Sequence, residues 1–157
     1  MDLENLLVFG ELGVALAGFS GITVAIGKRA QGHWDEADRK RLQDLLMASL
    51  GAACFGILPI VLTKSGMTDE LALQMCSGIF ALYLLVGSAG ILRGGSGRLG
   101  YSAWIFMIPM LLVIAMLALA AGGVLSRVLE FPYYLGLFWL LFLAATNFVS
   151  LLIRDAE

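Results

Sequence analysis

Glu11 is the residue of this 157-residue chain from which a chemical argument can begin. It is the only Asp, Glu, Lys, Arg or His within five long apolar stretches, which cover residues 5–27, 45–63, 71–92, 99–126 and 131–153. An ionised carboxylate at the centre of a membrane-spanning helix costs on the order of 3 kcal/mol on insertion scales. Such a side chain is therefore neutralised, paired or in contact with water.

The sequence leaves three interpretations of Glu11 open. The carboxyl group can be structural, either protonated or hydrogen-bonded to a neighbouring helix. It can line a water-filled pathway and bind a monovalent cation or a proton. It can also extend to the nearer membrane surface, where Lys64 and Arg127 are candidate ion-pair partners.

Two further polar side chains within the apolar stretches are candidates for an ion or proton pathway. Gln74 lies near the outer end of the third stretch, at a depth similar to that of Glu11, and could hydrogen-bond the carboxylate. Asn147 lies on the inner half of the fifth stretch, beside Thr146 and Ser150. An amide in hydrocarbon needs hydrogen-bond partners, so we expect Asn147 either to join helices or to line a polar pathway.

The sequence contains few residues that could carry out enzymatic chemistry. The single histidine, His33, falls in the loop after the first stretch. The apolar stretches contain no second carboxylate, histidine pair or His–Cys cluster that could hold a metal or activate water. The basic residues lie in short loops rather than on an extended patch, which argues against a nucleic-acid partner. We predict no cofactor, no metal and no enzymatic activity.

The apolar stretches themselves predict the architecture. Hydrophobic residues make up 60% of the chain, and the mean hydropathy is +0.91. Each stretch is about as long as a helix needs to cross a hydrocarbon core of ~30 Å at ~1.5 Å per residue. We predict one domain over residues 1–157, an all-α integral membrane bundle surrounded by the lipid bilayer. Its five transmembrane helices are expected at about residues 5–27, 43–63, 71–92, 102–126 and 132–153.

Small residues lie on two sides of the first stretch. Gly13, Ala17 and Gly21 recur every four residues, a spacing that lets helices approach closely. The second side consists of Glu11, Ala15, Gly18 and Ile22. We predict helix packing through Gly13, Ala17, Gly18 and Gly21. A helix that is narrow on both sides is expected in the core of the subunit or at an interface within a homo-oligomer.

The basic residues are divided unequally between the two sides of the predicted bundle. Those on the side of the first loop and the C-terminus are Lys28, Arg29, Arg39, Lys40, Arg41, Arg93, Arg98 and Arg154. The other side has Lys64 and Arg127. The positive-inside rule therefore predicts an external N-terminus and a cytoplasmic C-terminus. Tyr133 and Tyr134, at the start of the fifth stretch, are expected to anchor it in the headgroup region.

The first third of the chain resembles a known protein family. The residues concerned are Phe9-Gly10-Glu11-Leu12, Leu16-Ala17-Gly18-Phe19-Ser20-Gly21-Ile22 and Lys28-Arg29, followed by the region from Arg41-Leu42 to Leu58-Pro59-Ile60. They are similar to a family of small bacterial multi-spanning membrane proteins of unknown function. That family has an acidic residue and an alanine-glycine-phenylalanine-x-glycine motif in its first helix. The resemblance implies a multi-pass protein of the bacterial inner membrane and implies no particular activity.

Two classes of function remain. The first is a homo-oligomeric ion or proton channel, or an ion-coupled transport protein, that uses Glu11 in its first helix. The alternative is a non-conducting structural or regulatory membrane scaffold. They differ in whether Glu11 lies on a continuous path that water can reach.

The predicted topology can be checked by labelling with a thiol reagent that does not cross membranes. With an external N-terminus, Gln31→Cys should be shielded in intact cells and Met67→Cys should react, because the two residues lie in loops on opposite sides. The opposite labelling pattern would overturn the orientation.

Overall fold

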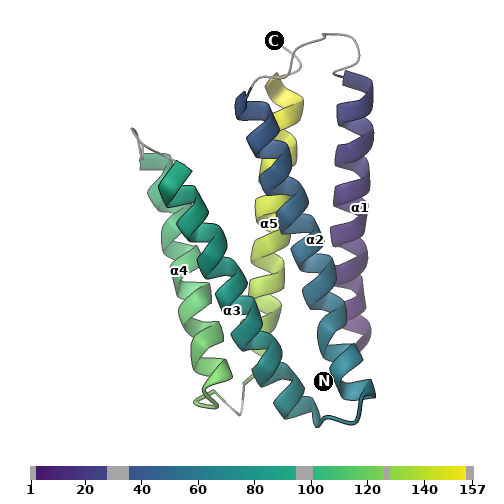
Figure 1. Ribbon diagram of the computed structural model, residues 1–157, viewed down its shortest axis with the longest axis vertical. Coiled ribbons are helices and arrows are strands. Elements are labelled where there is room, and N and C mark those ends of the chain that lie inside the picture. The colour runs from purple at the N-terminus through teal and green to yellow at the C-terminus, as the bar shows by residue number, and fades with distance from the viewer. Residues whose placement is uncertain (1–2, 28–35, 95–100, 126–127, 155–157) are drawn as a thin grey trace. The chain divides into compact units, whose positions relative to one another are not determined.

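A computed structural model of the chain describes residues 3–27, 36–94, 101–125 and 128–154. The regular elements of these residues are α-helices, and none of them forms a strand. The helices, shown in Figure 1, are α1 (Leu3–Gly27), α2 (Glu36–Lys64), α3 (Asp69–Gly94), α4 (Tyr101–Ala121) and α5 (Glu130–Arg154). The predicted all-α fold with five helices is confirmed. The orientation of the termini stays a prediction.

Four of the helices are long and apolar enough to cross a membrane. Their candidate spans are Glu4–Ile22, Arg39–Lys64, Asp69–Ala89 and Glu130–Leu152. In α4 the corresponding apolar section, Phe106–Ala121, is shorter. Pro59 and Pro109 lie inside α2 and α4, and both helices continue through them.

Glycine in the left-handed region ends both α2 and α4. Gly66 has φ +97° and Gly123 has φ +74°. At the end of α4, the Gly123 N–H donates to the Ala120 carbonyl at 3.1 Å, and the Val124 N–H donates to the Leu119 carbonyl at 3.1 Å. This pair of bonds is a Schellman motif, which satisfies the last carbonyls of a helix. The fourth helix therefore ends at residue 121 rather than at the predicted 126.

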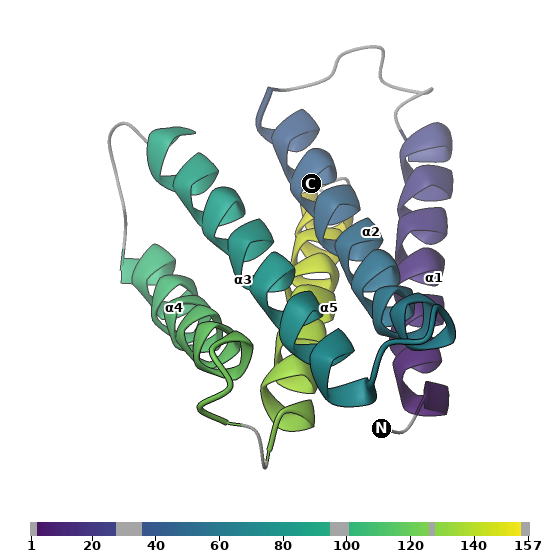
Figure 2. The same ribbon diagram turned by 60° about the horizontal axis from the view of Figure 1, so that its bottom comes forward.

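The chain divides into two compact units, Leu58–Gly136 and Asp2–Ile57 with Leu137–Glu157. In the first unit α3 and α4 pack along each other, as Figures 1 and 2 show. The start of α5 joins them through aromatic contacts. The ring of Tyr133 meets that of Phe80 edge to face at a centroid distance of 5.6 Å, and both side chains are fully buried. Tyr133 is also hydrogen-bonded to Cys76, so it lies in a protein core, and its expected place in the headgroup region stays a prediction.

In the second unit α1 crosses α2 with the two backbones in close contact (Figure 1). A Cβ placed on Gly13 would lie 2.5 Å from the Ser49 carbonyl oxygen, and one on Gly56 would lie 2.9 Å from the Leu6 carbonyl oxygen. Neither site has room for a methyl group. Such contacts place Cα–H groups against carbonyl oxygens, an interaction worth about 0.5–1 kcal/mol each.

Several sequence-based predictions concern residues outside the described part of the chain. They include the loop residues Lys28, Arg29 and His33, as well as Arg98 and Arg127. The charge asymmetry behind the predicted topology depends largely on these loops.

The close crossing predicts a specific cost for an added methyl group. Gly13→Ala should lower the free energy of unfolding by about 1–3 kcal/mol, because the new Cβ meets backbone atoms of α2 that cannot rotate away. The matched control is Gly87→Ala in α3, where a Cβ has no atom within 4 Å. That substitution should be neutral, or stabilising by up to about 1 kcal/mol through helix propensity. Denaturant unfolding in mild detergent measures both, and equal effects would contradict the tight crossing.

Candidate functional site: the Glu11 face of α1

Helix α1 is packed along one side and open along the rest. Leu6, Gly10, Gly13 and Ser20 are buried, and the glycines among them contact α2. Only 22% of the apolar window of α1 is buried, against 56% for that of α2. The first helix is therefore not in the core of the subunit, which was one of the two locations expected for it. An interface between subunits stays the other prediction.

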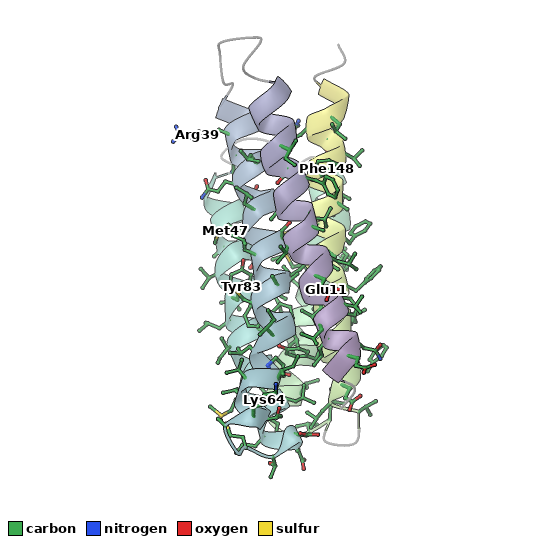
Figure 3. The ribbon with its side chains drawn as sticks, turned by 90° about the vertical axis from the view of Figure 1, so that its right-hand side faces the viewer. Glu11, Arg39, Met47, Lys64, Tyr83 and Phe148 are labelled. Atoms are coloured by element: carbon green, nitrogen blue, oxygen red, sulfur yellow. The ribbon has the colours of Figure 1, made fainter. Side chains whose placement is uncertain are left out.

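The side of α1 opposite to α2 carries the second set of small residues. Glu11, Ala15, Gly18 and Ile22 are all exposed within the chain, and we call them the Glu11 face. They share a side because 3.6 residues make one turn, so positions four and seven residues apart stay nearly in line. Figure 3, in which α1 is turned to the viewer, shows the Glu11 side chain on this open side.

The Glu11 carboxylate forms no hydrogen bond or ion pair in the described part of the chain. Its position is seven residues after the start of the Glu4–Ile22 candidate span, which is about 10 Å along the axis at ~1.5 Å per residue. In a bilayer the described residues thus offer this carboxyl group no partner at the depth of the candidate span. The proposed ion pairs with Lys64, in the other unit, and with Arg127, outside the described residues, stay predictions.

The neighbours of Glu11 on the open side of α1 are apolar. The side chains one turn away are those of Leu7, Val8, Val14 and Ala15, and all four are exposed. Near Gly18 and Gly21 a Cβ would have no atom within 4 Å, so the chain leaves open space beside both glycines. The surface around the carboxylate therefore combines large aliphatic residues toward the N-terminus with small residues toward the C-terminus.

Gln74 lies in the other compact unit, near the end of α4. Its amide nitrogen would be 3.5 Å from a Cβ on Gly123, the glycine that ends that helix. The side chain is half-buried. A hydrogen bond between Gln74 and Glu11 joins residues of two different units and stays a prediction.

Asn147 forms its hydrogen bond within its own helix. Its amide nitrogen donates to the Leu143 carbonyl at 2.9 Å, and the Thr146 hydroxyl donates to the same oxygen at 2.9 Å. The Ser150 hydroxyl donates to the Thr146 carbonyl at 2.8 Å. These three half-buried side chains thus each donate one hydrogen bond to the backbone of α5, as is common for such side chains in membrane helices. Among the described residues the amide nitrogen forms no interhelical bond, and a role of Asn147 in joining helices or lining a polar pathway stays a prediction.

The small residues of α1 differ in what surrounds them. Gly13 is buried against α2, and Ala17 is half-buried. Gly18 and Gly21 are exposed, and a Cβ on either would have no atom of the described residues within 4 Å.

Sequence reasoning missed two residues of the crossing, Gly10 and Gly56. A Cβ on Gly56 would lie 3.0 Å from the Gly10 nitrogen, so the two glycines face each other directly. The run Leu6, Gly10, Gly13, Ala17, with steps of four, three and four residues, carried the signal that could have found this side.

Comparison with protein-family models, with curated proteins and with solved structures finds no significant match. The resemblance of the first helix to small bacterial membrane proteins therefore stays an expectation. Among the described residues, no three His, Cys, Asp or Glu side chains are grouped closely enough to hold a metal ion.

Proposed function

We propose that the protein is a homo-oligomer of the bacterial inner membrane that conducts or transports an ion or a proton, with Glu11 as the binding group. The observation that carries this proposal is a carboxylate within a candidate membrane span, on the open face of α1, that has no partner among the described residues. A lipid-facing ionised carboxylate is costly, so contact with water or with another subunit is the favourable environment for it.

Oligomerisation through the Glu11 face is supported by its small side chains. Lipid-facing positions of membrane helices need no small residues, whereas helix interfaces are enriched in them because backbones can then approach. Ala15 and Gly18 leave room for a second α1 or for water next to the carboxylate. Carboxylates from several copies would then line one pathway and attract cations.

A non-conducting scaffold is the second candidate, and the polar residues of α5 favour it. Asn147, Thr146 and Ser150 donate to carbonyls of their own helix, so these donors need no water-filled path. In such a scaffold Glu11 would be protonated or hydrogen-bonded between subunits.

The first test concerns assembly. Native mass spectrometry in mild detergent should detect an oligomer, and Ala15→Cys should form a disulfide between copies when oxidised in lipid, because we propose that the Glu11 face lies at the interface. The matched control is Leu82→Cys, which is exposed at a similar position along α3 but outside that face. A protein that stays monomeric in lipid nanodiscs, or equal cross-linking at both positions, would exclude an interface at the Glu11 face.

The second test concerns permeation. Protein reconstituted in liposomes should show an ion or proton flux that Glu11→Gln reduces at least tenfold, while Glu11→Asp retains part of it because a carboxylate is still present. Oligomer yield and melting temperature should stay near those of the wild type, and the control Glu70→Gln, in the first turn of α3, should conduct normally.

Two results would reject a conducting role. No flux above that of empty liposomes, or a flux indifferent to Glu11→Gln, would leave the scaffold ahead. Loss of the oligomer in Glu11→Gln would instead assign a structural role to the carboxyl group.

A further inference from the structure

Two of the five helices pass from one compact unit to the other. Helix α1 lies in one unit, α3 and α4 lie in the other, and the boundary falls within α2 after Ile57 and within α5 after Gly136. We infer that the two units move as separate bodies, and that α2 bends at Pro59 and α5 at Gly136 to allow it. Such a movement belongs to the folded chain itself and does not require that an ion is carried.

The part of α2 before the boundary is packed tightly against α1. A Cβ on Gly56 would lie 2.9 Å from the Leu6 carbonyl oxygen, and one on Gly10 would lie 3.7 Å from the Ile57 side chain. Ile57 is the last residue of α2 in this unit, and Pro59 follows two positions later. The tight crossing with α1 thus reaches to within two residues of the proline.

Proline weakens a helix at its own position. Pro59 has no N–H, so α2 lacks one intrahelical hydrogen bond there, and the proline ring crowds the preceding turn. Prolines are among the few causes of a sharp bend within a helix. The Pro59 side chain is fully buried, so this weak point lies among protein side chains.

The start of α5 is packed against α3 and α4 up to the boundary. The Tyr133 ring meets the Phe80 ring at a centroid distance of 5.6 Å. A Cβ on Gly136 would lie 2.8 Å from the Phe80 ring and 3.4 Å from the Leu117 side chain. Gly136 is the last residue of α5 in this unit. Because glycine has no Cβ, its backbone has more freedom than that of other residues, and hinge residues are often small.

The two bending points lie at similar heights in their helices. Pro59 is five positions before Lys64, the end of α2, and Gly136 is six positions after Glu130, the start of α5. These separations are about 8 Å and about 9 Å along the helix axes at ~1.5 Å per residue. In the predicted topology the end of α2 and the start of α5 lie on the same side of the membrane. Two bends at one height define a single hinge axis.

Pro109 provides an internal comparison for Pro59. It lies inside α4, and the parts of α4 on both sides of it belong to the same unit. A bend at Pro109 would therefore deform one unit instead of moving one unit against the other. The two positions are chemically matched, since both are prolines in the interior of a helix.

The experiment measures distances between pairs of spin labels by pulsed electron paramagnetic resonance in lipid nanodiscs. One pair, Val14→Cys with Ile108→Cys, joins the two units, and the other, Leu71→Cys with Ile108→Cys, lies within one unit. All three side chains are exposed. The background variant Cys54→Ala removes the exposed cysteine, whereas Cys76 is buried. Labelled protein is diluted with unlabelled protein, so that distances within one chain are measured.

We expect the pair between the units to give a distance distribution roughly twice as wide as that of the pair within one unit. Pro59→Ala should narrow the wider distribution to the width of the other, because alanine supplies the missing N–H and favours the helix. The matched control, Pro109→Ala, should leave both widths as they are in the wild type.

The bend in α5 is tested in a background that has room for a methyl group. Phe80→Leu removes the ring that a Cβ on Gly136 would meet. The double variant Gly136→Ala with Phe80→Leu should give a narrower distribution between the units than Phe80→Leu alone, because alanine stiffens the helix. Equal widths in these two proteins would reject Gly136 as a bending point.

The remaining outcomes decide the inference for the whole chain. Equal widths for the two pairs in the wild type would overturn it, and this comparison needs no proline variant. A distribution between the units that stays wide in Pro59→Ala, or that narrows equally in Pro109→Ala, would reject Pro59 as a bending point. Ion flux plays no part in these measurements, so the hinge and the proposed function stand or fall separately.

Discussion

The contact of the α1 backbone with the α2 backbone is the constraint on which the arrangement around Glu11 depends. Gly10, Gly13 and Gly56 bring the helices so close that a methyl group at Gly13 would meet a carbonyl oxygen at 2.5 Å. A contact of this kind fixes which side of α1 is covered, because two backbones can approach so closely only where glycines face each other. Glu11, one residue after Gly10, is turned about 100° away from it and so to the open side.

Apolar burial by itself would give α1 no preferred rotation in a bilayer. Lipid tails are as apolar as leucine, so helices in a membrane associate through close packing rather than through the hydrophobic effect. The exposed Val14 and Phe19 of α1 lose nothing by facing hydrocarbon. A carboxylate differs, because no described residue of the single chain offsets the free-energy cost of placing it in lipid. This asymmetry is why the functional argument rests on Glu11 rather than on any apolar feature of the helix.

The other unit is held together by a different kind of contact. There Phe80, Tyr133 and Cys76 are buried together, with the Phe80 ring so close to Gly136 that a Cβ would lie 2.8 Å from it. One aromatic ring packs against a glycine here, whereas two glycine backbones meet directly at the crossing of α1 and α2. The hydroxyl of Tyr133 is hydrogen-bonded to the Cys76 side chain, and this bond lets a tyrosine be fully buried.

Most of the helical architecture could be predicted from the sequence, because long apolar runs leave the backbone no hydrogen-bond partners except its own. The apolar runs predict the five helices, and they single out Glu11 as the charged residue within them. The end of α4 was missed, because Gly122 and Gly123 extend an apolar run while the positive φ of Gly123 stops the helix.

Only the tertiary structure decided which of the two small sides of α1 packs on α2, since both satisfy the same spacing rule. It also placed Tyr133 in a core, because burial depends on residues far away in the chain, such as Phe80 and Cys76, and not on local pattern.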